Sequence, residues 1–87
     1  PNVRGYATAF AQRLAQEAGD DLEKAVRTGY QAALGREPDA DETAATIAFL
    51  KNQEASYGEA KQKNPRHLAL VDLAQTLLSL NEFSYLR

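Results

Sequence analysis

The apolar residues of this 87-residue chain recur at helical spacing along its whole length, and no stretch alternates with the period of two that marks a strand. Glycine and proline interrupt the helical pattern at Gly19, Gly35, Pro38 and Asn64-Pro65. A glycine commonly ends a helix, and a proline cannot continue one. We therefore predict an all-α fold, a compact bundle of about four helices.

The first two predicted helices cover residues 3–18 and 21–34. Their predicted core-facing residues are Tyr6, Phe10 and Leu14 in the first helix, and Leu22, Val26, Tyr30, Ala33 and Leu34 in the second. Asp20 is expected to be the N-cap of the second helix, and Glu23 three residues later would complete a capping box. Gly19 and Gly35 supply the left-handed residue that ends each helix.

The third predicted helix begins after Asp39, which is expected to cap it with Glu42 as the reciprocal acid. Its core-facing stripe is Thr43, Ile47, Leu50 and Tyr57, while Ala44, Ala45 and Ala48 are expected to allow close approach of neighbouring helices. The pattern fades around Gly58, and Asn64-Pro65 starts a fourth helix over about residues 65–81. Two apolar rows make this helix the expected central one: Leu70, Leu73, Leu77 and Leu80, and Val71, Ala74 and Leu78.

The composition excludes several classes of function. The chain has no cysteine, which excludes disulfides, thiolate metal sites and cysteine nucleophiles, and a single histidine excludes a histidine-rich metal site. Ten Lys and Arg residues against twelve Asp and Glu residues give a net charge of -2. This charge argues against nucleic acid as the main partner, because such binding depends on clustered positive charge. No window approaches about 18 consecutive apolar residues, so we expect no membrane insertion.

One acidic cluster imitates a calcium site. Asp39, Asp41 and Thr43 have the spacing that opens an EF-hand loop. That loop needs glycine at its sixth position and an acid at its twelfth, and this sequence has Ala44 and Leu50 there. Acids in the first turn of a helix interact favourably with the helix dipole. We therefore predict a capping role and no metal site.

Neither the other acids nor the histidine predict catalysis. Glu17, Asp20 and Asp21 lie next to a helix end, with no sign of the apolar pocket that would raise a carboxyl pKa. The one basic stretch, residues 61–67, contains no aromatic residue and is expected to be a solvated connection. His67 is expected to be an exposed residue of the first helical turn. We predict no catalytic residue, no cofactor and no enzymatic activity.

Arg36 is the most specifically placed charge, because it follows Gly35 and directly precedes Glu37-Pro38. A guanidinium carries five donors and can fix the turn between two helices by pairing with a carboxylate. Glu42 and Glu82 are the available acids. We expect Arg36→Ala to lower the melting temperature without abolishing any binding.

Two stretches resemble a known family. Residues 26–42, VRTGYQAALGREPDADE, are similar to a Tyr…Leu-Gly-Arg-x-Pro…Glu helix–turn–helix segment, and residues 73–85, LAQTLLSLNEFSY, resemble its closing Leu…Asn-Glu-Phe-x-Tyr signature. Together they resemble the C-terminal end of the planctomycete-specific domain family, which has no known function. The resemblance is close in these two motifs and loose over residues 6–87. The Leu-Gly-Arg-x-Pro-Asp pattern also occurs in a bacterial helical repeat domain of secreted proteins, whereas the closing signature favours the first family.

The resemblance implies a cellular context and no specific chemistry. Members of the family are large surface or periplasmic proteins, often with cytochrome c-like, haem-binding domains. The resemblance thus implies an extracytoplasmic location, with residues 1–87 as one helical domain at the C-terminus of a larger protein. The chain has no Cys-x-x-Cys-His motif and cannot itself hold covalent haem. The implied structural signature is Tyr30, Gly35, Arg36, Pro38, Glu42, Asn81, Glu82, Phe83 and Tyr85.

The leading hypothesis is a non-enzymatic helical interaction or structural module that packs on the rest of its parent chain or on another protein domain. One alternative is an independent helical repeat-type scaffolding or adhesion module, and another is an accessory subdomain that completes an enzyme site elsewhere in the parent. Phe83 and Tyr85 either cover the end of the bundle or form an exposed apolar patch, and a patch would favour the first hypothesis. A uniformly polar surface would favour the second, and a pocket holding Arg36 or His67 the third.

Overall fold

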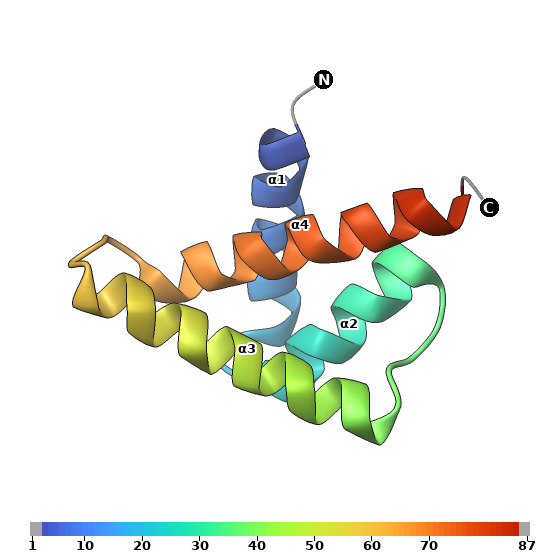
Figure 1. Cartoon of the computed structure of the whole chain (residues 1–87), viewed down its shortest axis with the longest axis horizontal. Coiled ribbons are helices and arrows are strands. Elements are labelled where there is room, and N and C mark those ends of the chain that lie inside the picture. Colours follow the sequence, from blue (N-terminus) through green and yellow to red (C-terminus); the bar gives the residue numbers. More distant parts are fainter. Residues whose placement is uncertain (1–2, 86–87) are drawn as a thin grey trace.

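The computed structural model describes residues 3–85 of the chain, with side chains described for residues 4–81. Four helices make up this part of the molecule, α1 (Val3–Ala18), α2 (Leu22–Leu34), α3 (Ala40–Glu59) and α4 (Pro65–Tyr85) (Figure 1). Residues 3–85 contain no strand. The predicted all-α bundle of about four helices is confirmed.

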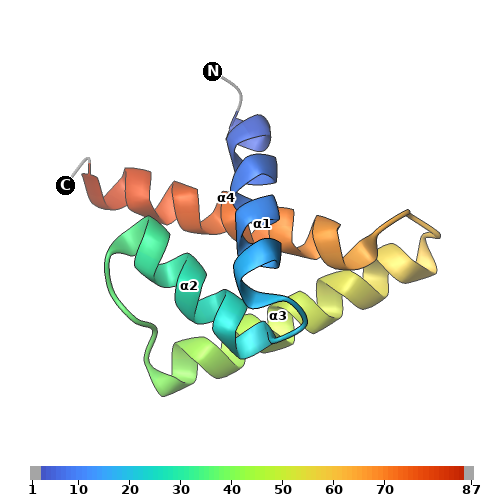
Figure 2. The same ribbon diagram turned by 180° about the vertical axis from the view of Figure 1, so that it is seen from behind.

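The fourth helix is central, as predicted. Both α2 and α4 contact each of the other three helices, and the most extensive contacts in the bundle are those of α4 with α1 and with α3. Figure 1 shows α1 crossing behind α4, and the view from behind in Figure 2 brings α1 to the front. The connection between α2 and α3 and the loop between α3 and α4 lie at opposite ends of the molecule in both views.

The core is built mainly on α4. Its buried residues are Ala69, Leu70, Val71, Leu73, Ala74 and Leu77. Pro65 is the first residue of the helix, as predicted, and the helix continues to Tyr85 instead of ending near Asn81. The prediction that Leu80 is part of the buried row is wrong, since its side chain is 46% exposed. Leu80 lies on the side of α4 that borders two open grooves, where no helix covers it.

The face that α1 turns to the core differs from the predicted one. Tyr6 is 65% exposed, so the predicted stripe is wrong at this residue. Phe10 is partly buried and packs against the core, and Leu14 is fully buried. The buried residues of α1 are Ala7, Ala11, Leu14 and Ala18. Three alanines at helical spacing let the backbone of α1 approach α4 closely, and aromatic rings in the same positions would hold the helices apart.

The caps of α2 confirm one prediction and correct another. Gly35 ends α2 with a left-handed φ of 70°, as predicted. The N-cap is Asp21 and not Asp20, because the Asp21 carboxylate accepts the backbone N–H of Lys24 at 3.1 Å. Gly19 has a φ of 60°, and the turn after it is closed by a hydrogen bond from the Asp21 N–H to the Ala18 carbonyl. Asp20 is therefore part of the turn, and α2 starts one residue later than predicted.

The third helix has its predicted start, and its predicted stripe of Thr43, Ile47, Leu50 and Tyr57 is buried or partly buried, but the prediction for its alanines is wrong. Asp39 and Glu42 form the capping box, with the Glu42 N–H donating to Asp39 Oδ1 at 2.7 Å and the Asp39 N–H donating to Glu42 Oε1 at 3.0 Å. Leu50 is the one fully buried residue of α3. The three alanines predicted to face neighbouring helices, Ala44, Ala45 and Ala48, are all exposed. Ala45 and Ala48 lie on the side of α3 away from Leu50, and Ala44 borders an open groove between α2 and α3.

Candidate functional site

The predicted pairing of Arg36 with a carboxylate, which fixes the turn between α2 and α3, is present. Arg36 donates from Nη1 to Glu42 Oε1 at 2.8 Å and from Nη2 to Glu42 Oε2 at 2.9 Å, a bidentate pair. The left-handed Gly35 directs the chain back toward α3 and so brings Arg36 over the start of that helix. The same Glu42 carboxylate belongs to the capping box with Asp39. Of the two acids expected as partners, Glu42 is the one observed, and the side chain of Glu82 lies outside the described residues.

The partners of Glu42 set its charge state. Hydrogen bonds from the Arg36 side chain and then from the Asp39 backbone lower the pKa of the Glu42 carboxyl to about 2. The guanidinium carbon of Arg36 also lies 5.5 Å from the centroid of the Tyr30 ring, within the range of a cation–π interaction. Tyr30 is buried, and its hydroxyl is 3.5 Å from Thr46 Oγ1 on α3. The cluster therefore fastens α2 to α3, which is a structural role.

Two further signature residues, Pro38 and Asn81, line grooves. Pro38 is half-buried and lines a groove between α2 and α3. Asn81 is exposed and borders a small groove of about 210 Å³ together with Arg36 and Leu80. Phe83 and Tyr85 belong to the signature too, but their side chains lie outside the described residues.

A second polar cluster joins three helices, and the sequence did not predict it. Oδ2 of Asp72, on α4, accepts hydrogen bonds from the Tyr57 hydroxyl at 2.7 Å and from Gln53 Nε2 at 2.8 Å, both on α3. Oδ1 of Asp72 accepts from Arg4 Nη1 on α1 at 3.0 Å. The same nitrogen donates to Gln75 Oε1 at 2.8 Å. We call these five residues the Asp72 node.

Both oxygens of the Asp72 carboxylate are engaged within the node. Partial burial raises the pKa of Asp72, but the hydrogen bonds from Tyr57, Gln53 and Arg4 lower it more, so the net shift is downward. The pKa of Tyr57 is raised, chiefly because its hydroxyl donates to Asp72 and also because it is partly buried. Asp72 therefore stays ionised and Tyr57 protonated at neutral pH. The node cross-links helices and offers no free acid–base pair.

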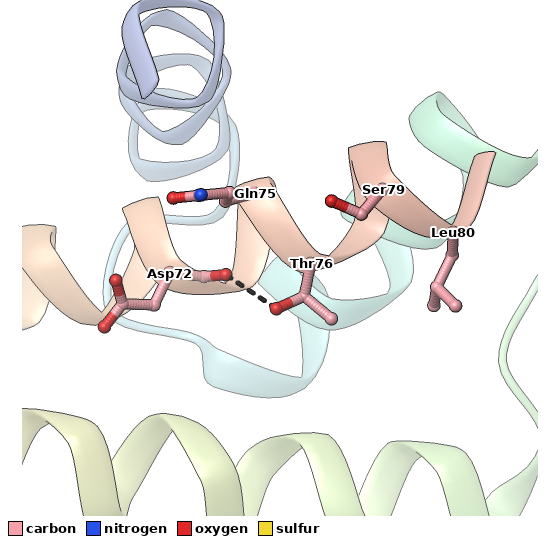
Figure 3. Close-up of a pocket in the computed structure, with 5 residues that line it drawn as sticks. All are labelled: Asp72, Gln75, Thr76, Ser79 and Leu80. Atoms are coloured by element: carbon pink, nitrogen blue, oxygen red, sulfur yellow. Dashed lines mark hydrogen bonds between the residues drawn. The ribbon is translucent and has the colours of Figure 1, made fainter. Parts of the chain in front are cut away.

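A groove of about 570 Å³ runs along α4 beside the Asp72 node (Figure 3). Its described lining residues all come from α4, namely Asp72, Gln75, Thr76, Ser79 and Leu80. Figure 3 shows Gln75 pointing toward α1, and Leu80 projecting from the far end of the row. The Thr76 hydroxyl donates to the Asp72 carbonyl oxygen of its own helix at 2.9 Å. The groove thus presents an exposed leucine and Ser79 beside Asp72, Gln75 and Thr76, which already have partners. This lining suits contact with another surface better than chemistry.

His67 lies in the first turn of α4, as predicted, but it is half-buried instead of exposed. It borders an open groove of about 400 Å³ with Asp20 and Glu54. The neighbouring Arg66 donates from Nη2 to the Gly19 carbonyl oxygen at 3.4 Å, which links the start of α4 to the end of α1. Within the part of the chain that the structure describes, no three His, Cys, Asp or Glu residues are grouped to hold a metal ion.

No protein-family model matches this chain, and neither does any curated protein or solved structure. The resemblance to the planctomycete-specific family and the resemblance to the helical repeat domain both stay predictions. No helix within the described residues is long and apolar enough to cross a membrane.

Proposed function

We propose that this chain is a non-enzymatic helical interaction module that packs on the rest of a larger parent chain or on another protein domain. The observation that supports the proposal is the incomplete burial of α3. Among its 20 residues Leu50 is the one that is fully buried. Residues 43–50 contain no charged side chain, although most of them are exposed or only partly covered.

The middle of the side of α3 opposite Leu50 carries Ala45, Ala48, Asn52 and Ala55, all exposed, and we call these four residues the outward face of α3. Two exposed acids, Asp41 and Glu59, lie at the two ends of this side. A surface helix usually turns charged side chains toward water. The outward face instead carries three methyl groups and one amide. Since the distance between packed helices depends on the side chains at the contact, small residues allow another helix to approach closely. This face therefore suits docking of a helix.

Site-specific photo-crosslinking tests the proposal. A photoreactive amino acid is placed at Ala48 in the protein produced by its own cells, and a matched control carries it at Gln16, which is exposed on α1. We expect a discrete cross-linked product from position 48 and none from position 16. The peptide joined to position 48 then identifies the parent segment or the partner. Equal products from both positions, or no product from either, would reject the outward face as a docking surface.

The resemblance extends the proposal to the parent protein. It suggests an extracytoplasmic planctomycete protein in which this domain is C-terminal and cytochrome c-like domains precede it. Peptide mapping of the native polypeptide tests this extension. A polypeptide several times longer than 87 residues, with a haem-bearing Cys-x-x-Cys-His peptide, is the expected result. A native polypeptide of this length alone would contradict the extension and leave the docking proposal to its own test.

A further inference from the structure

We infer that copies of this chain associate head to tail, with the loop between α3 and α4 of one copy seated in the groove between α2 and α3 of the next. The groove lies on the side of α3 that faces α2, and the outward face of α3 does not line it. The inference therefore does not depend on the proposed function, and each has its own test.

The groove between α2 and the first half of α3 has a volume of about 460 Å³. Its apolar part includes Pro38, Ala44 and Ile47. Pro38 and Ile47 are half-buried and Ala44 is exposed, so apolar surface is left uncovered between the two helices. An occupant that fits this groove must bring methylene or methyl groups to cover it.

The rim of the same groove is acidic. It carries the carboxylates of Glu23, Glu37 and Asp39 and one guanidinium, that of Arg27. Arg27 lies 3.7 Å from Glu23 as an i,i+4 pair, which leaves Glu37 and Asp39 in excess. A cationic occupant complements this rim.

The loop at the opposite end of the molecule is basic. All five residues of the loop between α3 and α4, residues 60–64, are exposed, and they include Lys61 and Lys63 but no acid. Figures 1 and 2 show this loop at one extremity and the connection between α2 and α3 at the other. The loop and the rim of the groove therefore carry charges of opposite sign.

Lysine suits both parts of the groove. Its four methylenes can lie along apolar surface while the ammonium stays near carboxylates and water. Lys61 and Lys63 of one copy can thus cover part of the apolar surface beside Ile47 and pair with Glu37 and Asp39 of the next copy. Exposed ion pairs contribute little each and are screened by salt, so the association is expected to be weak and salt-sensitive.

The symmetry of the contact makes a distinctive prediction. The loop and the groove are different surfaces, so the interface is heterologous, and every dimer still has one free loop and one free groove. We expect the weight-average mass in sedimentation equilibrium to rise past that of a dimer as the concentration approaches about 1 mM at low salt. In about 0.5 M salt the mass should fall to that of the monomer. A chain that stays monomeric at low salt, or stops at the dimer, overturns the inference.

Two charge-neutralising variants test which surfaces meet. The loop variant carries Lys61→Gln and Lys63→Gln, and the groove variant carries Glu23→Gln and Glu37→Gln. Each variant alone is expected to remain monomeric. An equimolar mixture is expected to form a dimer and nothing larger, because it pairs one intact groove with one intact loop.

A matched control has Lys24→Gln and Lys51→Gln, which removes two exposed lysines outside the loop. This control is expected to associate as the wild type does, and circular dichroism verifies that all variants are helical. A mixture of the loop and groove variants that stays monomeric, or a control that loses association, overturns the loop-in-groove contact.

Discussion

Asp72 holds side chains from α1 and α3 with the two oxygens of one carboxylate. The side chain is 16% exposed, so the carboxylate has lost much of its contact with water. Burying a charge is unfavourable unless hydrogen bonds replace those to water. Tyr57, Gln53 and Arg4 supply these bonds, and each of them is in turn held in place by the carboxylate.

The substitution Asp72→Asn keeps the size of this side chain and removes its charge and one acceptor. The new amide would present N–H donors toward the donors of Tyr57, Gln53 or Arg4. Since hydrogen bonds to charged groups are strong, we expect the free energy of unfolding to fall by about 1–3 kcal/mol. Urea denaturation measures this loss. Asp20→Asn, at an exposed position, is the control and should change stability by less than about 0.5 kcal/mol. Equal losses in both variants would show that the node does not form in solution.

Glu42 makes the stability of the fold depend on pH in the acid range. Its carboxyl has a pKa of about 2 in the folded chain, against 4.5 for the free side chain. Folding therefore favours the ionised form, and the stability that Glu42 contributes is complete above about pH 4.5 and is lost as the pH falls toward 2. Glu42→Gln should flatten the decline of the urea midpoint between these two pH values. Asp72 is present in both proteins, so the difference isolates Glu42. Identical pH profiles would mean that the pair with Arg36 is not formed.

At the scale of whole helices, the sequence predicted the ends better than the faces. Helix ends depend on local chemistry, such as the left-handed glycines and the proline at the start of α4, and local chemistry is visible in the sequence. The face of α1 was not predictable in the same way. The stripe of Tyr6, Phe10 and Leu14 and the stripe of Ala7, Ala11 and Leu14 both have helical spacing. The close crossing with α4 selects the alanines, and that crossing is a property of the assembled fold.

The two polar clusters also differ in how far the sequence could predict them. Arg36 and Glu42 are six positions apart and flank one turn, so the sequence could place them together. Arg4 and Asp72 are 68 positions apart on different helices. No spacing rule connects them, and only the packing of α1 across α4 brings them together. The Asp72 node was therefore beyond prediction from this sequence alone.

The start of α2 offers a direct test of the corrected cap. Asp20 and Asp21 are adjacent and chemically identical, but only the Asp21 side chain accepts the Lys24 N–H. Replacing an N-cap aspartate by alanine typically costs about 0.5–2 kcal/mol of stability. We expect this loss for Asp21→Ala and a much smaller one for Asp20→Ala, measured by thermal or urea unfolding. A larger loss from Asp20→Ala would restore the helix start that the sequence predicted.

At the scale of the whole molecule, three helices converge on Gly29. This residue is buried in the middle of α2. Glycine inside a helix lowers its stability, so the sequence alone indicates only that Gly29 destabilises α2. The structure supplies the reason for it. A Cβ at Gly29 would lie 3.0 Å from Leu77 Cδ1 of α4 and 3.5 Å from Leu14 Cδ1 of α1. The two leucines fill the space that a side chain at position 29 would occupy, and both are almost completely buried.

Gly29→Val therefore tests the packing of the whole bundle. Its Cβ and two methyl groups would meet Leu77 and Leu14, and overpacking a core typically costs about 1–3 kcal/mol. Gly58→Val is the matched control, because a Cβ at Gly58 has no neighbour within 4 Å and valine is no worse than glycine in a helix. We expect urea unfolding to show a large loss at position 29 and little change at position 58. Since Leu14 and Leu77 come from α1 and α4, similar results at the two positions would mean that these helices do not meet over α2, and the arrangement of the bundle would be wrong.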